Sequence, residues 1–339
     1  MAELPAHPGT WLVTGGSGFL GHHVLRHLSA AGRMVRSLDV RPLELDLPGV
    51  EGVEGDVRDA ELLGRLCRGV DVVVHAAAVL PSGRDVQANI LGAGTVAGAA
   101  RACGVRRSVL VSSAVVYGLP RSPVAETAAP QPVEGYGRSK LAAERAWLAQ
   151  APSPVVLRPS AFIGPERLGV FGILFRWISE GRRIYVVGDG RNRYQLLAVD
   201  DLVAAIALAG GCKWEGVANV GGLLSGTVRD DLEGLIRHAG SRSRIVGLPA
   251  RPTRAALALL EATALSPLQR WHRLSAAHDL VFECALARDR LGWEASASGL
   301  ECLISAYDWY VSEGRNRPRG TTHRAQWSER GLSLLRRIS

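Results

Sequence analysis

The chain has few of the features that mark membrane, secreted or metal-binding proteins. Its 339 residues contain no apolar run near the roughly 18–20 residues that a membrane helix needs. Its first residues lack a basic stretch followed by an apolar one, so we expect no signal peptide. We therefore expect a cytoplasmic globular protein with no transmembrane segment.

Cysteine is scarce and scattered, with no close pair among the five positions. This spacing argues against both a disulfide framework and a zinc site. We expect reduced thiols packed as small hydrophobic side chains and no bound metal. The positions are Cys67, Cys103, Cys212, Cys284 and Cys302.

The chain also lacks the charge pattern of a nucleic-acid-binding protein, although its formal net charge is +8. Seven arginines and one glutamate in residues 314–339 contribute +6, which leaves +2 for the rest of the chain. A basic tail without interleaved aromatic residues is typical of a solvated or docking segment. We expect no nucleic-acid partner.

Lysine is nearly absent, because 38 of the 40 basic residues are arginine. The two lysines are Lys140 and Lys213. A lysine in such a chain therefore suggests a chemical requirement that arginine does not meet, such as a compact point charge.

A glycine-rich turn near the start of the chain is the first motif with a chemical meaning. It follows a short apolar run at residues 10–14 and precedes residues 22–31, whose apolar side chains have helical spacing. A second strand is expected at residues 34–39. In this context the backbone N–H groups of the turn bind a pyrophosphate at a helix N-terminus. The expected cofactor-binding residues are Gly15, Gly18, Phe19, Leu20 and Gly21.

Asp39 ends the second expected strand, 18 residues beyond Gly21. A carboxylate at this place accepts hydrogen bonds from the adenosine ribose and repels a 2′-phosphate, so NAD is favoured over NADP. Arg36 and Arg41 flank Asp39 and could weaken that preference by receiving a phosphate. Arg41 is counted among the expected cofactor-binding residues.

Strands and helices continue to alternate along the chain, which predicts a doubly wound parallel sheet. Residues 70–75 form a continuous apolar run, as a buried parallel strand does. A helix is expected over residues 85–102, and residues 107–113 form the next strand, which ends in two serines. Ligands bind at the carboxyl edge of such a sheet, so these serines are candidate site residues.

Tyr136 and Lys140 stand four residues apart at the start of a helix expected to run to about Gln150. That spacing places both side chains on one helical face. A nearby ammonium lowers the pKa of a phenol and makes the tyrosine a usable base. Ser113, at the neighbouring strand end, can hydrogen-bond the same substrate oxygen. These three residues are the expected catalytic group, and Lys140 is also expected to contact the cofactor ribose.

The combined motifs resemble those of the extended short-chain dehydrogenase/reductases, in the NAD-dependent epimerase/dehydratase group. The resemblance covers nearly the whole chain, and its motifs occur in family order. They are the Gly15–Gly21 turn, Asp56–Val57, His75–Ala78, Val111–Gly118, Tyr136–Lys140, Arg158–Pro165, Val199–Asp201 and Leu291–Trp293.

The resemblance assigns further roles to individual residues. It implies that Asp56 and Val57 hold the adenine, and that Ala76, Ala77 and Ala78 line the nicotinamide-ribose side. It matches the catalytic serine to Ser113 rather than Ser112, and a helix asparagine to Asn89. It also implies a homodimer formed through the helices at residues 85–102 and 136–150.

The substrate is less narrowly defined. Dehydratases of the 4,6 type carry an Asp-Glu pair after the catalytic position, whereas Ser113 is followed by Ala114 and Val115. Nucleotide-sugar epimerases carry a phosphate-binding arginine at the position of Tyr194. Arg191 and Arg193, beside Tyr194, could instead bind a diphosphate, or they could form a solvated basic loop.

A Rossmann domain is expected over residues 1–164 and about 196–222, with a discontinuous substrate domain over 165–195 and 223–313 and a tail over 314–339. A helical stretch over residues 251–274 is interpreted as packing on the core. The preferred function is an NAD-dependent nucleotide-sugar epimerase that reacts at a secondary alcohol or ketone. The alternatives are a dehydrogenase or reductase of a non-nucleotide substrate, such as a sterol, acyl or natural-product ketone, and an NAD-binding protein without catalysis.

Overall fold

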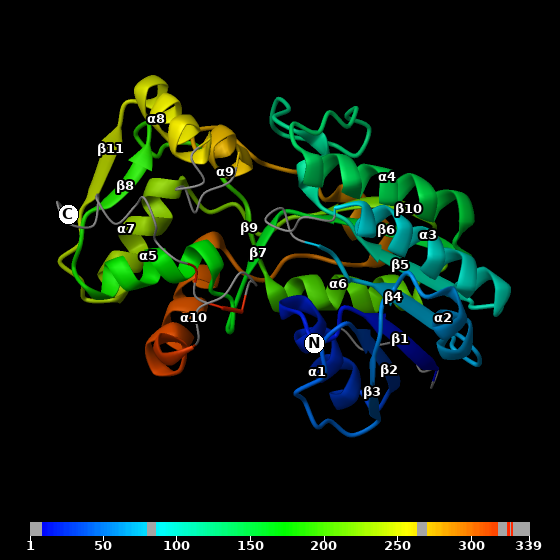
Figure 1. Cartoon of the computed structure of the whole chain (residues 1–339). Coiled ribbons are helices and arrows are strands. Elements are labelled where there is room, and N and C mark those ends of the chain that lie inside the picture. The colour runs from blue at the N-terminus through cyan, green and yellow to red at the C-terminus, as the bar shows by residue number, and fades with distance from the viewer. Residues whose placement is uncertain (1–8, 80–85, 263–269, 318–323, 326, 328–339) are drawn as a thin grey trace.

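The computed structural model describes residues 9–79, 86–262, 270–317, 324–325 and 327. These residues form two lobes, seen at the right and left of Figure 1. We call the larger one the sheet lobe, because a seven-stranded sheet forms its centre. The smaller one, built mostly from residues beyond Gly164, is called the second lobe. No helix in the described part of the chain is long and apolar enough to cross a membrane.

The central sheet is parallel throughout, with strand order β10-β6-β5-β4-β1-β2-β3. This order and the helices on both faces confirm the predicted doubly wound Rossmann fold. The continuous apolar run predicted as a strand becomes β4, and all four of its residues are buried. The strands are β1 (Thr10–Thr14), β2 (Met34–Asp39), β3 (Val50–Glu54), β4 (Val72–His75), β5 (Arg107–Val111), β6 (Pro154–Pro159) and β10 (Gly216–Val220).

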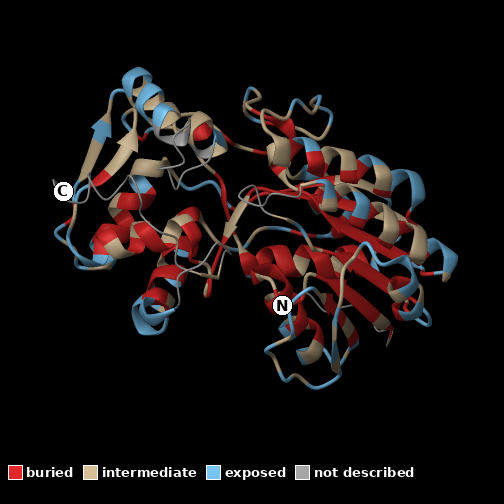
Figure 2. Cartoon of the chain, viewed as in Figure 1, coloured by how far each residue is buried: buried red, intermediate tan, exposed pale blue. Residues whose placement is uncertain are grey.

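Helices cover both faces of the sheet, and each face has its own hydrophobic core (Figure 2). One core contains side chains of α1 (Phe19–Ala30) and α6 (Val199–Gly211). The opposite core contains side chains of three helices and includes the fully buried Trp147. Those helices are α2 (Ala60–Leu66), α3 (Gln87–Ala102) and α4 (Gly135–Gln150).

The second lobe surrounds a core of aromatic and branched side chains in which Phe175 contacts Tyr307 and Tyr310. The predicted helical stretch over residues 251–274 is divided between two helices, and residues 263–269 lie outside the described residues. The elements are α5 (Gly169–Ser179), β8 (Ile184–Val187), α7 (Val228–His238), β11 (Ile245–Leu248), α8 (Ala250–Ala262), α9 (Arg270–Ser275) and α10 (Gly299–Ser312).

The paired strands β7 (Ala161–Ile163) and β9 (Leu196–Ala198) and the segment around η2 (Ala287–Leu291) lie where the lobes meet. The two strands pair in parallel between the lobes. The π-helical turn η2 and Trp293 belong to the core that α1 and α6 form on the sheet. The Trp293 indole donates a hydrogen bond of 2.8 Å to the Asp201 carbonyl. Part of the segment assigned to the substrate domain from sequence therefore packs on the sheet lobe.

Candidate active site

A cavity of about 970 Å³ lies between the carboxyl edge of the sheet and the second lobe. Its lining joins the glycine turn after β1, the ends of β2, β4 and β5, and side chains of α4, α5, α7 and α9. It therefore lies where an open parallel sheet binds ligands.

The glycine turn has the close packing that a dinucleotide cradle requires. Gly15 has φ +82°, and a Cβ there would lie 2.7 Å from the Ala77 nitrogen. A Cβ on Gly21 would collide with the Gly15 carbonyl. Helix α1 then begins at Phe19, so its free N–H groups face the cavity, as a diphosphate needs.

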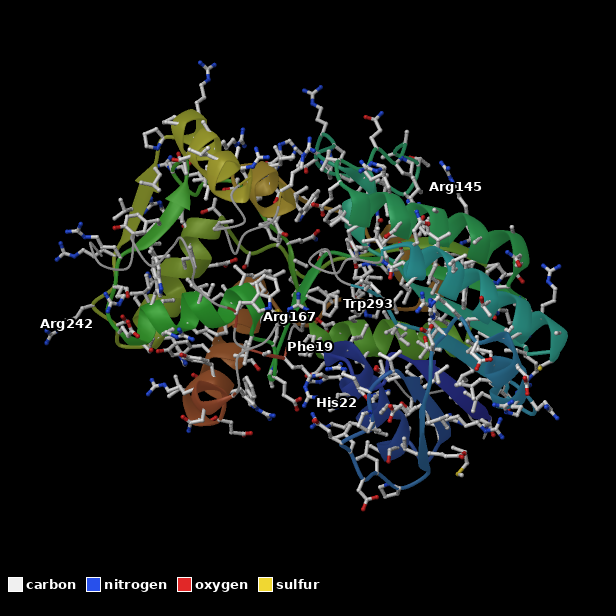
Figure 3. The ribbon with its side chains drawn as sticks, in the orientation of Figure 1. Phe19, His22, Arg145, Arg167, Arg242 and Trp293 are labelled. Atoms are coloured by element: carbon white, nitrogen blue, oxygen red, sulfur yellow. The ribbon has the colours of Figure 1, made fainter. Side chains whose placement is uncertain are left out.

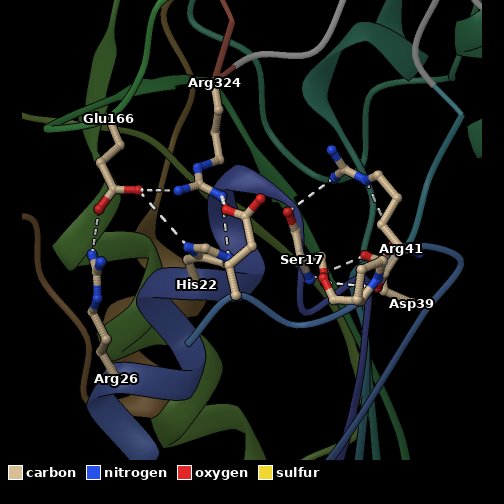
Figure 4. A network of polar contacts seen from close by, with 9 residues as sticks. Ser17, His22, Arg26, Asp39, Arg41, Glu166 and Arg324 are labelled. Atoms are coloured by element: carbon tan, nitrogen blue, oxygen red, sulfur yellow. Dashed lines mark hydrogen bonds and ion pairs between the residues drawn. The ribbon is translucent and has the colours of Figure 1, made fainter. Parts of the chain in front are cut away.

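The end of β2 provides the group expected to contact the adenosine ribose (Figure 4). The Asp39 carboxylate accepts hydrogen bonds of 3.1 Å from the backbone N–H groups of Ser17 and Arg41. Arg41 donates from Nη2 to the Ser17 carbonyl at 2.9 Å, and Arg36 donates from Nη1 to two backbone carbonyls behind the strand. Both arginines thus have partners other than a 2′-phosphate, and Asp39 stays at the cavity wall.

The other residues assigned to the cofactor by resemblance also line this end of the cavity. They are Asp56, Val57, Ala76, Ala77 and Ala78. A hydrogen bond from Arg58 lowers the pKa of Asp56, whose carboxylate is 2.6 Å from that guanidinium. Asn89 also lines the cavity and exchanges hydrogen bonds with the backbone of Val79, which fixes α3 against the end of β4.

Ser113, Tyr136 and Lys140 all line the same cavity. The Ser113 hydroxyl caps the short 3₁₀ turn η1 (Ala114–Tyr117) by accepting a hydrogen bond from the Val115 N–H. The neighbouring Ser112 hydroxyl is instead bonded to Glu144 inside the sheet lobe. The structure thus brings the three expected catalytic residues together.

The electrostatics of this group differ from the sequence-based expectation. Burial raises the pKa of Tyr136 to about 12, with the Arg167 charge opposing and Glu134 adding to the rise. The sequence alone predicts a lowered pKa through the charge of Lys140. Burial also lowers the pKa of Lys140 to about 8 against the effect of Glu144. The prediction of a lowered tyrosine pKa is therefore wrong for this pocket, because it ignored the desolvation of both groups.

A buried polar network supports the floor of the site. Arg158 binds both carboxylate oxygens of Glu144, at 3.0 and 2.7 Å, and donates to the Tyr117 hydroxyl at 2.8 Å. Tyr117 in turn donates to the Asn219 side chain at 2.8 Å. Because these groups satisfy one another, β6, α4 and β10 are joined directly behind the catalytic side chains.

The substrate side departs from the sequence-based expectation at two positions. Tyr194 lines the cavity, whereas Arg191 and Arg193 do not. Arg193 binds Asp279 at 2.9 Å and Arg191 lies 3.7 Å from Asp189. Both the backbone N–H and the guanidinium of Arg193 donate hydrogen bonds to the Asp279 carboxylate, which holds this side chain outside the cavity. Of the two alternatives, a diphosphate clamp and a solvated basic loop, the placement of Arg191 and Arg193 favours the solvated loop.

The substrate side is instead mostly apolar, but it includes charged side chains that sequence reasoning missed, among them Arg167 and Asp231. Arg167 lines the cavity near the catalytic tyrosine. Asp231 lines it from α7, where burial and then the neighbouring Asp230 raise its pKa to about 6. Both follow from tertiary packing, and no motif marks them. The apolar lining includes Phe162, Phe171, Leu174, Trp271, Phe282 and Trp327.

The fold and this site define an enzyme of the extended short-chain dehydrogenase/reductase type. A model of the NAD dependent epimerase/dehydratase family matches residues 11–221, and the chain belongs to that family. The predicted family and its NAD dependence are thereby confirmed, and the glycine cradle and Asp39 fit that cofactor.

Several known proteins are similar to this chain. An uncharacterized protein, y4nG, of Sinorhizobium fredii is 34% identical, covering 96% of this chain and 85% of its own length. A ceramide reductase of Caulobacter vibrioides is 32% identical, covering 90% of this chain and 96% of its own. The structure of MoeE5 in complex with UDP-glucuronic acid and NAD has a TM-score of 0.74 at 27% identity, covering 89% of this chain and 99% of that one.

Proposed function

We propose that the protein is an NAD-dependent reductase or dehydrogenase that interconverts a ketone and a secondary alcohol on a largely apolar substrate. The composition of the substrate wall carries this proposal. Its lining is mostly aromatic and aliphatic, and Arg191 and Arg193, for which a diphosphate site and a solvated loop were both open, lie near carboxylates outside it. The similarity to a ceramide reductase, whose name indicates a lipid substrate, supports the same substrate class.

The catalytic residues divide the work between proton transfer and orientation. A nicotinamide cofactor held by the glycine turn and Asp39 would supply the hydride exchange with the carbon that bears the reacting oxygen. Tyr136, with its pKa raised to about 12, is a neutral phenol at pH 7 and can donate its proton to the ketone oxygen during reduction. The Ser113 hydroxyl holds the same oxygen, and the Lys140 ammonium stabilises the phenolate left on Tyr136.

A nucleotide-sugar epimerase is the second candidate. It uses the same catalytic residues, but the ketone stays bound and receives the hydride on its other face. The similarity to MoeE5, crystallised with a UDP-sugar and NAD, favours it. Against it stands the placement of Arg191 and Arg193 outside the cavity wall.

Two assays on the purified protein separate these candidates. The first follows NADH oxidation at 340 nm with 2-dodecanone as the ketone. The second incubates UDP-glucose or UDP-glucuronic acid with protein carrying bound NAD and no added reductant. NADH-dependent reduction of 2-dodecanone supports the proposal, whereas epimerisation of the sugar without net NADH consumption overturns it.

We also propose that the protein forms a homodimer through α3 and α4, which pack against each other on one face of the sheet lobe. Each helix exposes a leucine: Leu91 of α3 is 57% exposed and Leu148 of α4 is 41% exposed. Light scattering after size exclusion should give twice the monomer mass for the wild-type protein. The measured mass of Leu91→Asp should fall towards that of the monomer. A wild-type monomer would contradict this proposal.

A further inference from the structure

Arg167 is a half-buried arginine in the cavity wall, and no described carboxylate pairs with its charge. Its guanidinium carbon lies 5.2 Å from the ring centre of Phe19 and 4.9 Å from that of Phe162. Figure 3 shows it beside Phe19, between the two lobes. Within the described part of the chain, its Nη1 is buried and has no hydrogen-bond partner. Ring faces stabilise the charge, but they leave these N–H donors unsatisfied.

The other arginines of the cavity wall are differently placed. Among the described lining residues, Arg41, Arg58 and Arg324 each lie within 4 Å of a carboxylate. Glu166, the acid next to Arg167 in the chain, is already bound by Arg26 at 2.6 Å and by Arg324 at 3.0 Å. The structure therefore gives Arg167 no acid of its own among the described residues.

Arg167 lies close enough to the catalytic tyrosine for its charge to affect that phenol. Its charge acts on the phenol groups of both Tyr136 and Tyr194, which line the substrate side of the cavity. The diphosphate of the cofactor has other donors, namely the free N–H groups at the start of α1. A buried, unsatisfied N–H group on a cation, such as the Nη1 group of Arg167, is costly unless a ligand supplies the opposite charge.

We propose that Arg167 binds a carboxylate that the substrate carries close to the hydroxyl or ketone reacting at Tyr136. This inference rests on the proposed function and narrows it to amphipathic substrates, with an apolar body and one anionic group beside the reacting carbon. A β-hydroxy acid with a long alkyl chain has this chemistry. The planar guanidinium can bind such a carboxylate through two parallel hydrogen bonds, which also orients the neighbouring alcohol.

The test compares two ligands that differ in the carboxylate. Calorimetry with saturating NADH, which prevents oxidation of an alcohol, measures the affinity of wild-type protein for 3-hydroxydodecanoate and for 2-dodecanol. We expect the acid to bind at least about tenfold more tightly. In Arg167→Met the two affinities should become equal, and Arg167→Lys should restore part of the preference.

The controls separate the possible outcomes. Arg242→Met removes an exposed arginine from the loop between α7 and β11, far from the cavity lining (Figure 3), and should leave the preference unchanged. Thermal melting of each variant verifies folding. Equal affinities in wild type, or a preference that survives in Arg167→Met, would overturn the inference. So would a tenfold loss of NADH affinity in Arg167→Met, because it would assign the arginine to the diphosphate.

Failure of this inference can be told apart from failure of the proposed function. If wild-type protein reduces 2-dodecanone but binds both ligands equally, only the role of Arg167 is wrong. If it neither reduces 2-dodecanone nor binds either ligand, both are wrong.

Discussion

The Lys140 ammonium donates a hydrogen bond of 2.7 Å to the carbonyl of Val111, the last residue of β5. This bond ties α4 to the strand end that precedes Ser113, so one side chain fixes the relative position of the catalytic serine and tyrosine. Lys140 is almost fully buried, at 4% exposure, and its compact ammonium fits there. A planar guanidinium would not fit in this way, which gives a physical reason for a lysine in an arginine-rich chain.

Lys140 should make reduction sensitive to alkaline pH. Burial lowers the pKa of Lys140 to about 8, so the side chain is charged below pH 8 and loses its proton above it. Because the charge stabilises the phenolate of Tyr136, kcat for ketone reduction should fall as the pH rises through about 8. Lys140→Met should lower kcat by at least about 100-fold and abolish this limb. If kcat of Lys140→Met still falls as the pH rises through about 8, another group causes this pH dependence.

Tyr136→Phe removes the proton donor and leaves the ring in place. Turnover should fall by about a thousandfold or more, since no other group supplies the proton to the substrate oxygen. The affinity for NAD should stay within about twofold of wild type, because Asp39 and the glycine turn hold the far end of the cofactor. Stopped-flow or steady-state absorbance at 340 nm measures the first quantity and calorimetry the second. Substantial residual turnover would require a different catalytic acid.

Asp39 should determine the choice between NAD and NADP. Its carboxylate, fixed by the N–H groups of Ser17 and Arg41, accepts ribose hydroxyl donors and repels a 2′-phosphate. Asp39→Ser should weaken NAD binding by about tenfold and strengthen NADP binding, because the repulsion is lost. Calorimetric titration with both cofactors measures the change. Tighter binding of NADP than of NAD by the wild-type protein would contradict this role.

The sheet lobe was predictable because its signals are local. A buried parallel strand is a continuous apolar run, and the glycine turn and the Tyr136–Lys140 spacing each lie within a few residues of sequence. The family resemblance added the roles of residues such as Asp56. These short-range patterns are enough to predict the residues that line the cofactor end of the cavity.

The substrate side could not be read in the same way. The direction of the Arg193 side chain depends on its bonds to Asp279, more than 80 residues away in the sequence. The prediction for Tyr136 considered its charged neighbour but not its burial, which is a property of the assembled pocket. Arg167 follows the Arg158–Pro165 motif by only two residues, yet nothing in the motif indicates that two aromatic rings enclose it.

The basic C-terminal segment contributes a structural bond that should be measurable. Arg324 binds Glu166 at 3.0 Å and lies 3.2 Å from His22 of α1 (Figure 4). Both members of the ion pair are mostly buried, so their coupling should exceed that of a surface pair and reach about 1 kcal/mol. Urea unfolding of wild type, Arg324→Ala, Glu166→Gln and the double variant gives this coupling energy.

The same variants test whether the segment helps to position Arg167. Glu166 directly precedes Arg167 and has φ +69°. Residues other than glycine rarely adopt this backbone conformation unless surrounding contacts stabilise it. Release of Glu166 from Arg324 should therefore lower the preference for 3-hydroxydodecanoate over 2-dodecanol while leaving NADH affinity unchanged. Arg26→Ala, which removes the other arginine bound to Glu166, should act in the same direction. If Arg324→Ala lowers stability but leaves the ligand preference intact, Arg324 only stabilises the fold.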